Sequence, residues 1–403
     1  MNYSVTVEQL EKTDPAMRYV IDIRPSDAFA RGSFPGAVSV PADDPESTLA
    51  ALKEIVADRS FPVFVLCHTG QRSPDVVSFL RENGYDAWDV EGGYRSFLKL
   101  QLSRIVSRPD EMRERTASIE RSIIKKYRKQ LWSRFTKAVR DYELIQEGDH
   151  VAVCISGGKD SMLLAKLMQE IWRHGKVRFD LTFLCMDPGY NPDNWAIIEN
   201  NARILDIPLT VFHSDIFDAV AGVDRHPCYL CARMRRGYLY SRAKALGCNK
   251  IALGHHYDDV IETILMGMLY AGKVETMMPK LHSQHFEGME LIRPLYLIRE
   301  ADIKQWRDGN DLHFIQCACR FTENCASCGG GRTSKRDEVK ALIAGLCLEE
   351  PTIAQNIFNS VTDINLYNVI GYHKGEMRYR FTDDYEMKNA PGIPEAFYRK
   401  EKN

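Results

Sequence analysis

The 403-residue chain lacks the features that direct a protein into a membrane or out of the cell. No apolar run reaches the roughly 18 residues that a membrane-spanning helix needs. Its first residues, MNYSVTVEQLEKTDPAM, contain no basic segment followed by an apolar one, so we predict no signal peptide. We therefore expect a cytoplasmic protein with no membrane partner.

The chain also has little net charge, because 53 Lys and Arg residues nearly balance 55 Asp and Glu residues. This balance excludes a simple polycation that binds nucleic acid over its whole surface, so any such binding must come from local clusters. Internal repeats and low-complexity tracts are absent as well. The length predicts two or three ordinary domains.

Cysteine is not scarce, and its eleven residues need an explanation. In a reducing compartment cysteines more often bind metals or act in catalysis than form disulfides. Four of them lie in apolar or mixed runs and are predicted to be ordinary thiols: Cys154, Cys185, Cys248 and Cys347. The other seven occur in spaced groups or after a strand-like run, which packing would not require.

The alternation of strand-like and helix-like segments predicts two α/β domains. Residues 5–100 alternate in short units, which indicates a small α/β domain. Residues 148–300 alternate in longer units, which indicates a mostly parallel, doubly wound sheet. We predict four regions: an N-terminal domain 1–100, a basic helical linker 101–145, a second domain 146–345, and an extension 346–403 of unknown role.

The linker contains a strongly basic stretch. Between Arg121 and Arg140 there are eight Lys or Arg residues and no acid, with apolar residues at helical spacing between them. The pattern predicts a basic amphipathic helix whose apolar side packs on a domain. Eight uncompensated charges favour contact with an RNA backbone. The predicted contacts are Lys125, Lys126, Arg128 and Lys129.

The segment VAVCISGGKDS, residues 151–161, breaks from an apolar run into glycines, a lysine and an aspartate. Glycines allow positive φ and close backbone approach, and the N–H groups at a helix start attract phosphate. Lys159 adds a positive charge. The spacing matches neither GxxxxGK[ST] nor GxGxxG, and a chance glycine turn after a strand is the alternative.

SGGKDS resembles the pyrophosphate loop of the PP-loop ATP-pyrophosphatase superfamily. The resemblance implies that the loop binds ATP, and that pyrophosphate is released when a substrate is adenylated. It also implies that Asp160 takes part in catalysis and helps to place Mg²⁺. The residues assigned to ATP in this way are Ser156, Gly157, Gly158, Lys159, Asp160 and Ser161.

Three further segments narrow the resemblance: PCYLCARMRRGYLY (227–240), IALGHHYDDVIETIL (251–265) and IRPLYLIREADI (292–303). Together they resemble the tRNA 2-thiocytidine synthetases, over roughly residues 130–345. That family adenylates the C2 oxygen of an anticodon-loop cytidine, position 32, and replaces it with sulfur, assisted by a 4Fe–4S cluster. The resemblance adds Asp187, Gly254, His255 and Asp258 to the ATP site and Arg235 and Arg236 to the tRNA contacts. His255 and Asp258 could instead make only local hydrogen bonds.

Two groups of cysteines are candidates for a metal site. Cys228 and Cys231 form C-x2-C, and Cys317, Cys319, Cys325 and Cys328 form C-x-C-x5-C-x2-C. The resemblance implies a cluster on Cys228, Cys231 and Cys317, with the three later cysteines as rivals of Cys317. Thiolates suit both iron–sulfur clusters and zinc, and spacing alone favours a structural Zn²⁺ site on Cys228, Cys231, Cys325 and Cys328. The loop at 156–161 and the RRGYLY context favour the cluster.

Near the N-terminus, FVLCHTGQRS places Cys67 after an apolar strand and before a polar loop and a helix. Backbone N–H groups, Arg72 and the helix start should favour the thiolate and make Cys67 a nucleophile; a buried, unreactive thiol is the alternative. The loop resembles the active-site loop of rhodanese sulfurtransferases, supported by segments 20–41, with Asp22 and Arg24, and 90–97. This resemblance, over about 5–100, implies that Cys67 carries a persulfide cradled by residues 68–72.

Combined, the two resemblances imply an ATP-dependent tRNA-thiolating sulfurtransferase whose fused rhodanese domain supplies the sulfur. Covalent linkage raises the local concentration of the sulfur carrier. A cysteine desulfurase or another sulfane donor would load Cys67, and a homodimer is left open. Two alternatives also stay open: a PP-loop sulfurtransferase for another tRNA base or a small metabolite, and a non-enzymatic, zinc-stabilised RNA-binding or sulfur-sensing module.

Overall fold

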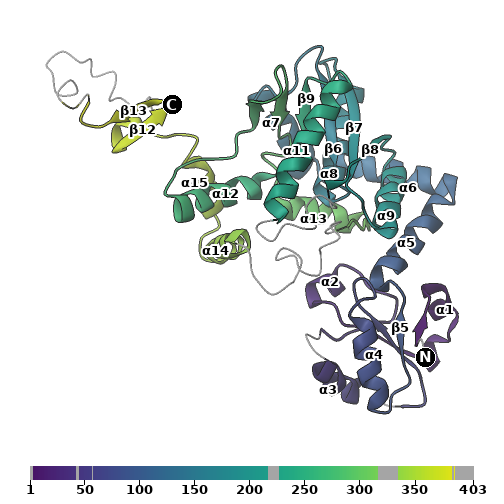
Figure 1. Ribbon diagram of the computed structural model, residues 1–403. Coiled ribbons are helices and arrows are strands. Elements are labelled where there is room, and N and C mark those ends of the chain that lie inside the picture. The colour runs from purple at the N-terminus through teal and green to yellow at the C-terminus, as the bar shows by residue number, and fades with distance from the viewer. Residues whose placement is uncertain are drawn as a thin grey trace. The chain divides into compact units, whose positions relative to one another are not determined.

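The computed structural model describes residues 3–41, 45–56, 58–216, 227–315, 335–383 and 385. The chain divides into two compact units (Figure 1). The first comprises residues 1–259 and 278–334, and the second comprises residues 260–277 and 335–403. No helix in the described ranges is long and apolar enough to cross a membrane.

The N-terminal domain, in the first unit, is built on a five-stranded parallel sheet with the order β1-β5-β4-β2-β3. All four residues of β4 are buried, as expected of a central parallel strand. The prediction of a small α/β domain is confirmed. The strands are β1 (Ser4–Val5), β2 (Tyr19–Asp22), β3 (Val38–Ser39), β4 (Val63–Leu66) and β5 (Ala87–Val90); the helices are α1 (Val7–Lys12), the 3-10 turn η1 (Pro15–Met17), α2 (Ser26–Ala30), α3 (Pro45–Ile55) and α4 (Ser73–Glu82).

The region that follows is helical but is not one continuous helix. It contains α5 (Gly93–Val106), α6 (Pro109–Ile124), the π-helical turn η2 (Arg128–Trp132) and α7 (Ser133–Asp141). Apolar side chains four residues apart are buried in the same cluster as the strands of the second sheet: Ile119, Ile123, Tyr127, Leu131 and Phe135. The expected packing side is confirmed, whereas the expected single helix is wrong, because α6 ends at Ile124.

The second domain contains a six-stranded sheet with the order β10-β11-β9-β6-β7-β8, in which only β10 runs antiparallel to its neighbour. In β6, Val151, Val153 and Ile155 join one core cluster with α8 and α9, while Ala152 and Cys154 join another with α11. Helices therefore cover both faces, and the predicted doubly wound sheet is confirmed.

The bounds of these elements place the carboxyl ends of the parallel strands. The strands are β6 (His150–Ile155), β7 (Asp180–Asp187), β8 (Leu209–His213), β9 (Lys250–Ala252), β10 (Lys280–His282) and β11 (Glu290–Ile292); the helices are α8 (Lys159–His174), α9 (Pro192–Ile204), α11 (Pro227–Ala245), α12 (Tyr257–Met266) with the π-helical turn η3 (Gly267–Ala271), and α13 (Glu300–Gly309).

The C-terminal region of the second unit begins with α14 (Lys335–Glu349), followed by α15 (Ile353–Asn359) and the 3-10 turn η4 (Leu366–Asn368). A β-hairpin of β12 (Gly371–Lys374) and β13 (Met377–Arg380) comes next. The sequence pattern did not predict this hairpin, because its strands are short and all of their residues are exposed.

Candidate active site

The glycine-rich loop lies where the strand order of the second sheet reverses. The strand β6 is flanked by β7 on one side and by β9 on the other, so the loop after β6 opens at the switch point of the sheet. Gly254, just after β9, packs against this loop: a Cβ there would lie 3.2 Å from the Asp160 carbonyl carbon. The structure thus brings the predicted Gly254 to the loop at residues 156–161.

The backbone of the loop explains its glycines. Gly157 has φ +84°, and a Cβ on it would lie 2.5 Å from Cγ1 of Ile198. Helix α8 begins at Lys159 without a side-chain cap, which leaves its first N–H groups for a ligand. The Ser161 hydroxyl donates to the Gly158 carbonyl (3.0 Å) and accepts from the Ser156 N–H (3.2 Å), so it closes the loop.

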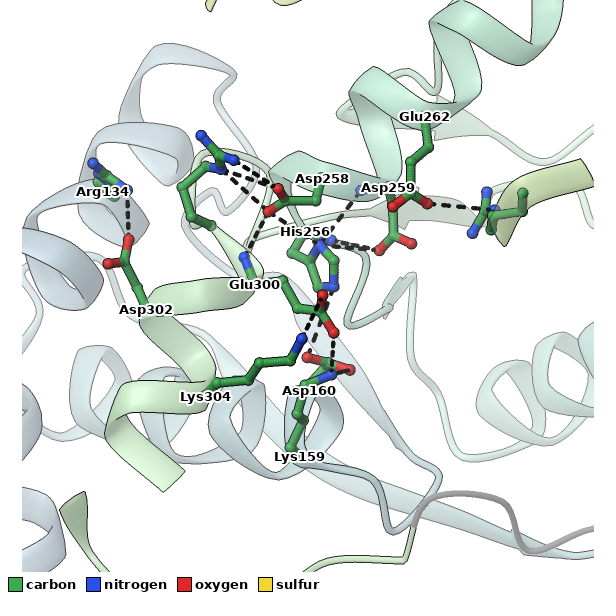
Figure 2. Close-up of polar contacts among 12 residues, drawn as sticks. Arg134, Lys159, Asp160, His256, Asp258, Asp259, Glu262, Glu300, Asp302 and Lys304 are labelled. Atoms are coloured by element: carbon green, nitrogen blue, oxygen red, sulfur yellow. Dashed lines mark hydrogen bonds and ion pairs between the residues drawn. The ribbon is translucent and has the colours of Figure 1, made fainter. Parts of the chain in front are cut away.

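The charge of Lys159 is held by two carboxylates. Its Nζ lies 3.0 Å from Oδ2 of Asp160 and 3.1 Å from Oε1 of Glu300, at the start of α13 (Figure 2). Glu300 also pairs with Lys304 at 3.0 Å. The second oxygen of Asp160, Oδ1, is buried without a hydrogen-bond partner among the described residues. An anion at this loop must therefore replace the carboxylates around Lys159, while Asp160 still has an oxygen for a cation.

The neighbouring histidine at the loop is His256. Its ring is 6% exposed and lies 3.9 Å from Oδ1 of Asp160, whereas the predicted His255 is only half-buried. Asp258 accepts from the Glu300 N–H at 2.6 Å and pairs with Arg299 at 2.9 Å, so it holds the start of α13 (Figure 2). Sequence reasoning did not assign His256, Arg299 and Glu300 to the site, although all three lie in the quoted segments 251–265 and 292–303.

Asp187 organises the turn after β7. Its Oδ1 accepts from the N–H groups of Gly189 (2.9 Å) and Tyr190 (2.8 Å), and its Oδ2 lies 3.1 Å from the His213 ring. Burial raises the pKa of Tyr190 to about 12, so the phenol stays neutral and accepts from Arg235 at 3.1 Å. Arg235 is thus turned toward Tyr190, while Arg236 is exposed.

The basic stretch is less uncompensated than its sequence indicates. Arg134 pairs with Asp302 at 2.6 Å, and Lys137 and Arg140 both pair with Asp141, which lies one residue beyond the acid-free stretch. The expectation of eight uncompensated charges is therefore wrong, since packing brings Asp302 from α13 and Asp141 follows directly at the end of α7. The four predicted RNA contacts are exposed: Lys125, Lys126, Arg128 and Lys129.

Of the candidate cluster ligands, the structure describes the side chain of Cys231. Cys228 and Cys231 both lie in α11, and Cys231 is a half-buried free thiol packed beside Met186 and Leu230. Cys317, Cys319, Cys325 and Cys328, and the side chain of Cys228, lie outside the described residues. Within the described part of the chain, no three His, Cys, Asp or Glu side chains form a metal-binding group.

The second reactive loop surrounds Cys67, which is 3% exposed at the end of β4. Its Sγ accepts from the Gly70 N–H at 3.0 Å and from the Ser73 hydroxyl at 3.1 Å. Gly70 has φ +76°, and Arg72 is exposed at the N-cap of α4. Two hydrogen-bond donors therefore point at this sulfur. By contrast, burial raises the pKa values of Cys154 and Cys185 to about 12, which fits ordinary core thiols.

A buried shell supports this loop. Asp22 and Arg24 form a two-bonded ion pair, and the Arg24 guanidinium lies 3.8 Å from the Tyr94 ring centroid. The Tyr94 N–H donates to the Cys67 carbonyl at 2.8 Å. Sequence reasoning missed Ser73, which also forms a hydrogen bond with Asp89. Burial raises the pKa of Asp89, and the hydrogen bond with Ser73 offsets only part of this rise. Asp22 and Arg24 thus act on the loop through Tyr94.

Each of the two reactive loops lies in a segment that matches a known protein family. Residues 127–319 match the PP-loop domain family and residues 6–100 match the rhodanese-like domain family. A U34-tRNA thiolase structure, NcsA from Methanococcus maripaludis with its [4Fe-4S] cluster, aligns with 58% of this chain and 79% of its own at 20% identity and a TM-score of 0.44.

Curated relatives align at higher sequence identity. A tRNA-cytidine(32) 2-sulfurtransferase of Anaeromyxobacter sp. (strain Fw109-5) is 34% identical over 241 residues, which is 59% of this chain and 77% of that protein. Another from Acaryochloris marina is 35% identical over 246 residues, 60% of this chain and 84% of that protein. This chain therefore belongs to the tRNA-cytidine(32) 2-sulfurtransferase family and carries a rhodanese-like domain in front of its PP-loop domain.

Proposed function

We propose that the chain catalyses ATP-dependent thiolation of cytidine 32 in tRNA, with the sulfur carried as a persulfide on Cys67. The observation that carries the proposal is the presence of two complementary loops in one polypeptide. One offers uncapped helix N–H groups and Lys159 to phosphates, and the other aims two hydrogen-bond donors at a thiol. The names of the aligned relatives supply the substrate.

In this proposal the loop at 156–161 holds the β- and γ-phosphates of ATP. The nucleobase C2 oxygen attacks the α-phosphorus, pyrophosphate leaves, and the oxygen becomes part of an AMP leaving group. Lys159 exchanges its contact with Glu300 for the phosphates, and Lys304 remains as a partner for the released carboxylate. The exchange leaves no charge unpaired in a half-buried site, which keeps its cost low.

Two further groups fit the residues present. The buried Oδ1 of Asp160 suits Mg²⁺, which prefers carboxylate oxygens and would neutralise charge on the phosphates. The free thiol of Cys231 suits an iron–sulfur cluster, with Cys228 and Cys317 as its other proposed ligands. Such a cluster would offer an iron site for sulfur. Metal analysis would distinguish such a cluster from Zn²⁺ bound by the same thiol.

The sulfur transfer balances with thiols alone. The Cys67 thiolate takes the outer sulfur of a donor persulfide, for which a cysteine desulfurase is the proposed source, and the donor cysteine leaves as a thiolate. The terminal sulfur then attacks C2 and displaces AMP. A second thiolate attacks the Cys67 sulfur, so that 2-thiocytidine is released and a disulfide to Cys67 remains. The donors from Gly70 and Ser73 would bond the Cys67 thiolate when it attacks the donor persulfide.

The test is a reconstitution under anaerobic conditions with ATP, tRNA and a persulfide donor. We expect AMP, pyrophosphate and 2-thiocytidine in equal amounts. Cys67→Ala should lose 2-thiocytidine with the persulfide donor and regain it with excess free sulfide. Cys347→Ala, which alters a half-buried free thiol elsewhere, is the matched control and should behave as wild type. Failure of the wild-type chain to split ATP into AMP and pyrophosphate with tRNA present would refute the proposal.

A further inference from the structure

The hairpin of β12 and β13 has two chemically different faces. Its register pairs Tyr372 with Tyr379 and Lys374 with Met377, so these four side chains share one face. Phe381 bonds through its N–H to the Ile370 carbonyl and extends the same face. The opposite face carries His373, Arg378 and Arg380.

Apart from Lys374 the first face is apolar, and its side chains are exposed in the described part of the chain. Exposed fractions run from 37% for Tyr379 to 83% for Ile370, with Met377 at 60% and Phe381 at 46%. A two-stranded hairpin on its own is marginally stable in water, and an exposed apolar patch marks an interaction site. A tight turn at Gly375, with φ +61°, fixes the register that gathers these side chains.

The aromatic rings already form a stacking platform. Tyr372 and Tyr379 stack with their centroids 4.7 Å apart and their planes 13° from parallel, and Phe381 contacts Tyr385 edge-on at 6.2 Å. Aromatic platforms of this kind bind unpaired bases, because every base has a π-face to stack. A ring pair held by cross-strand packing loses little further freedom on binding.

The charge of the hairpin selects among occupants. The two strands and their turn, residues 371–380, contain Lys374, Arg378 and Arg380 against the single acid Glu376, and Asp383 follows the second strand and accepts from the Arg380 N–H. A second copy of the hairpin would bring like charges together, which opposes self-association. A polyanion with unpaired bases satisfies both the rings and the charges. We propose that this hairpin binds unpaired nucleotides of the tRNA substrate. This inference rests on the proposed function.

The sharpest test is tRNA affinity of the full-length chain, measured by fluorescence anisotropy across a salt series. Tyr372→Ala and Tyr379→Ala should each weaken binding about 10-fold, near the low end for base–aromatic stacking, and leave the salt slope unchanged. Arg378→Ser with Arg380→Ser should lower the slope by about 1.4, at about 0.7 per phosphate contact of a single strand. The hydrophobic pairing of the hairpin is untouched in that double variant.

Two control variants test whether the loss of affinity comes from the aromatic rings of the hairpin. Tyr372→Phe retains the ring and should bind tRNA within about two-fold of wild type, since stacking does not need the hydroxyl. Trp172→Ala removes an exposed aromatic side chain outside the hairpin and should have no effect. A blunt RNA duplex without unpaired bases should not distinguish the Tyr variants from wild type.

The inference and the proposed function fail in different ways. If wild type thiolates tRNA and the hairpin variants keep its KM for tRNA and its affinity, the hairpin is not an RNA site. A change in oligomeric state with unchanged tRNA affinity would assign the apolar face to a protein partner and overturn the inference. If wild type binds tRNA through the hairpin but never thiolates it, the proposed function fails alone.

Discussion

The two reactive loops share one architecture and handle charge in opposite ways. Each follows a buried parallel strand, turns on a glycine of positive φ and leads into a helix. At Cys67 the reactive atom receives neutral donors from Gly70 and Ser73. At Lys159 the reactive charge is occupied by the carboxylates of Asp160 and Glu300. The first loop is ready for its chemistry, whereas the second must exchange partners when ATP binds.

This difference has an energetic reason. A thiolate needs only dipoles, and backbone and hydroxyl groups supply them without a competing ion. A half-buried lysine without a counterion would carry a large desolvation cost. In the loop without ligand, Lys159 is therefore neutralised by ion pairs with carboxylates. Glu300 and Asp160 thus compete with phosphate, and only a strongly anionic ligand gains from the exchange.

The largest expected effect is at Lys159. Lys159→Ala should lower pyrophosphate release by about 100- to 1,000-fold, the range seen when one preorganised electrostatic group is removed. Steady-state pyrophosphate detection with saturating tRNA would measure it. Persulfide formation on Cys67, followed by mass spectrometry, should be unchanged in the same variant, and its loss would break the assignment of separate roles to the loops.

Glu300→Gln tests the exchange itself, with a smaller effect of the opposite sign. Removing the competing charge should tighten ATP binding by a few-fold, about 1 kcal/mol for a partly exposed pair. The matched change is Lys304→Met, which takes away the other cation on Glu300 and should weaken ATP binding. Isothermal titration would decide, and equal affinities in all three proteins would contradict competition.

At the other loop, Ser73→Ala should slow iodoacetamide alkylation of Cys67 at pH 7 by about 5- to 10-fold, the effect of one hydrogen bond of about 1–1.5 kcal/mol. Ser73→Thr keeps the hydroxyl and should restore most of the rate. An alanine variant that reacts as fast as wild type would show that Gly70 alone suffices, and the loop would be less prepared than its geometry indicates.

The smallest effect is a pH-dependent one at Asp89. Because burial raises the pKa of Asp89, stability falls as pH rises from the unfolded-state value near 3.8 through the folded-state value, and the cost is absent in stronger acid. Asp89→Asn keeps a side chain that can hydrogen-bond to Ser73 and removes this cost, so the free energy of unfolding at pH 7 should rise. The rise is about 1.4 kcal/mol for each tenfold change in the ionisation constant. Urea unfolding at pH 4 and pH 7 would show whether the gain disappears in acid.

Much of the candidate site was predictable because its residues lie in short, local patterns. The segments SGGKDS and CHTGQR each follow a strand, and both loops were expected where they occur. Side-chain direction was harder to predict. His255 was favoured over His256, and Arg235 was expected to contact tRNA, yet His256 faces Asp160 and Arg235 bonds Tyr190.

The sequence by itself determined the two α/β domains, the turning points of their loops and the thiol and lysine that those loops carry. These follow from hydrophobic periodicity and from glycine conformation, which act over a few residues. Only the tertiary structure decided that Glu300 neutralises Lys159 and that Asp302 compensates part of the basic stretch. These ion pairs depend on which distant segments packing brings together, and local sequence does not encode that.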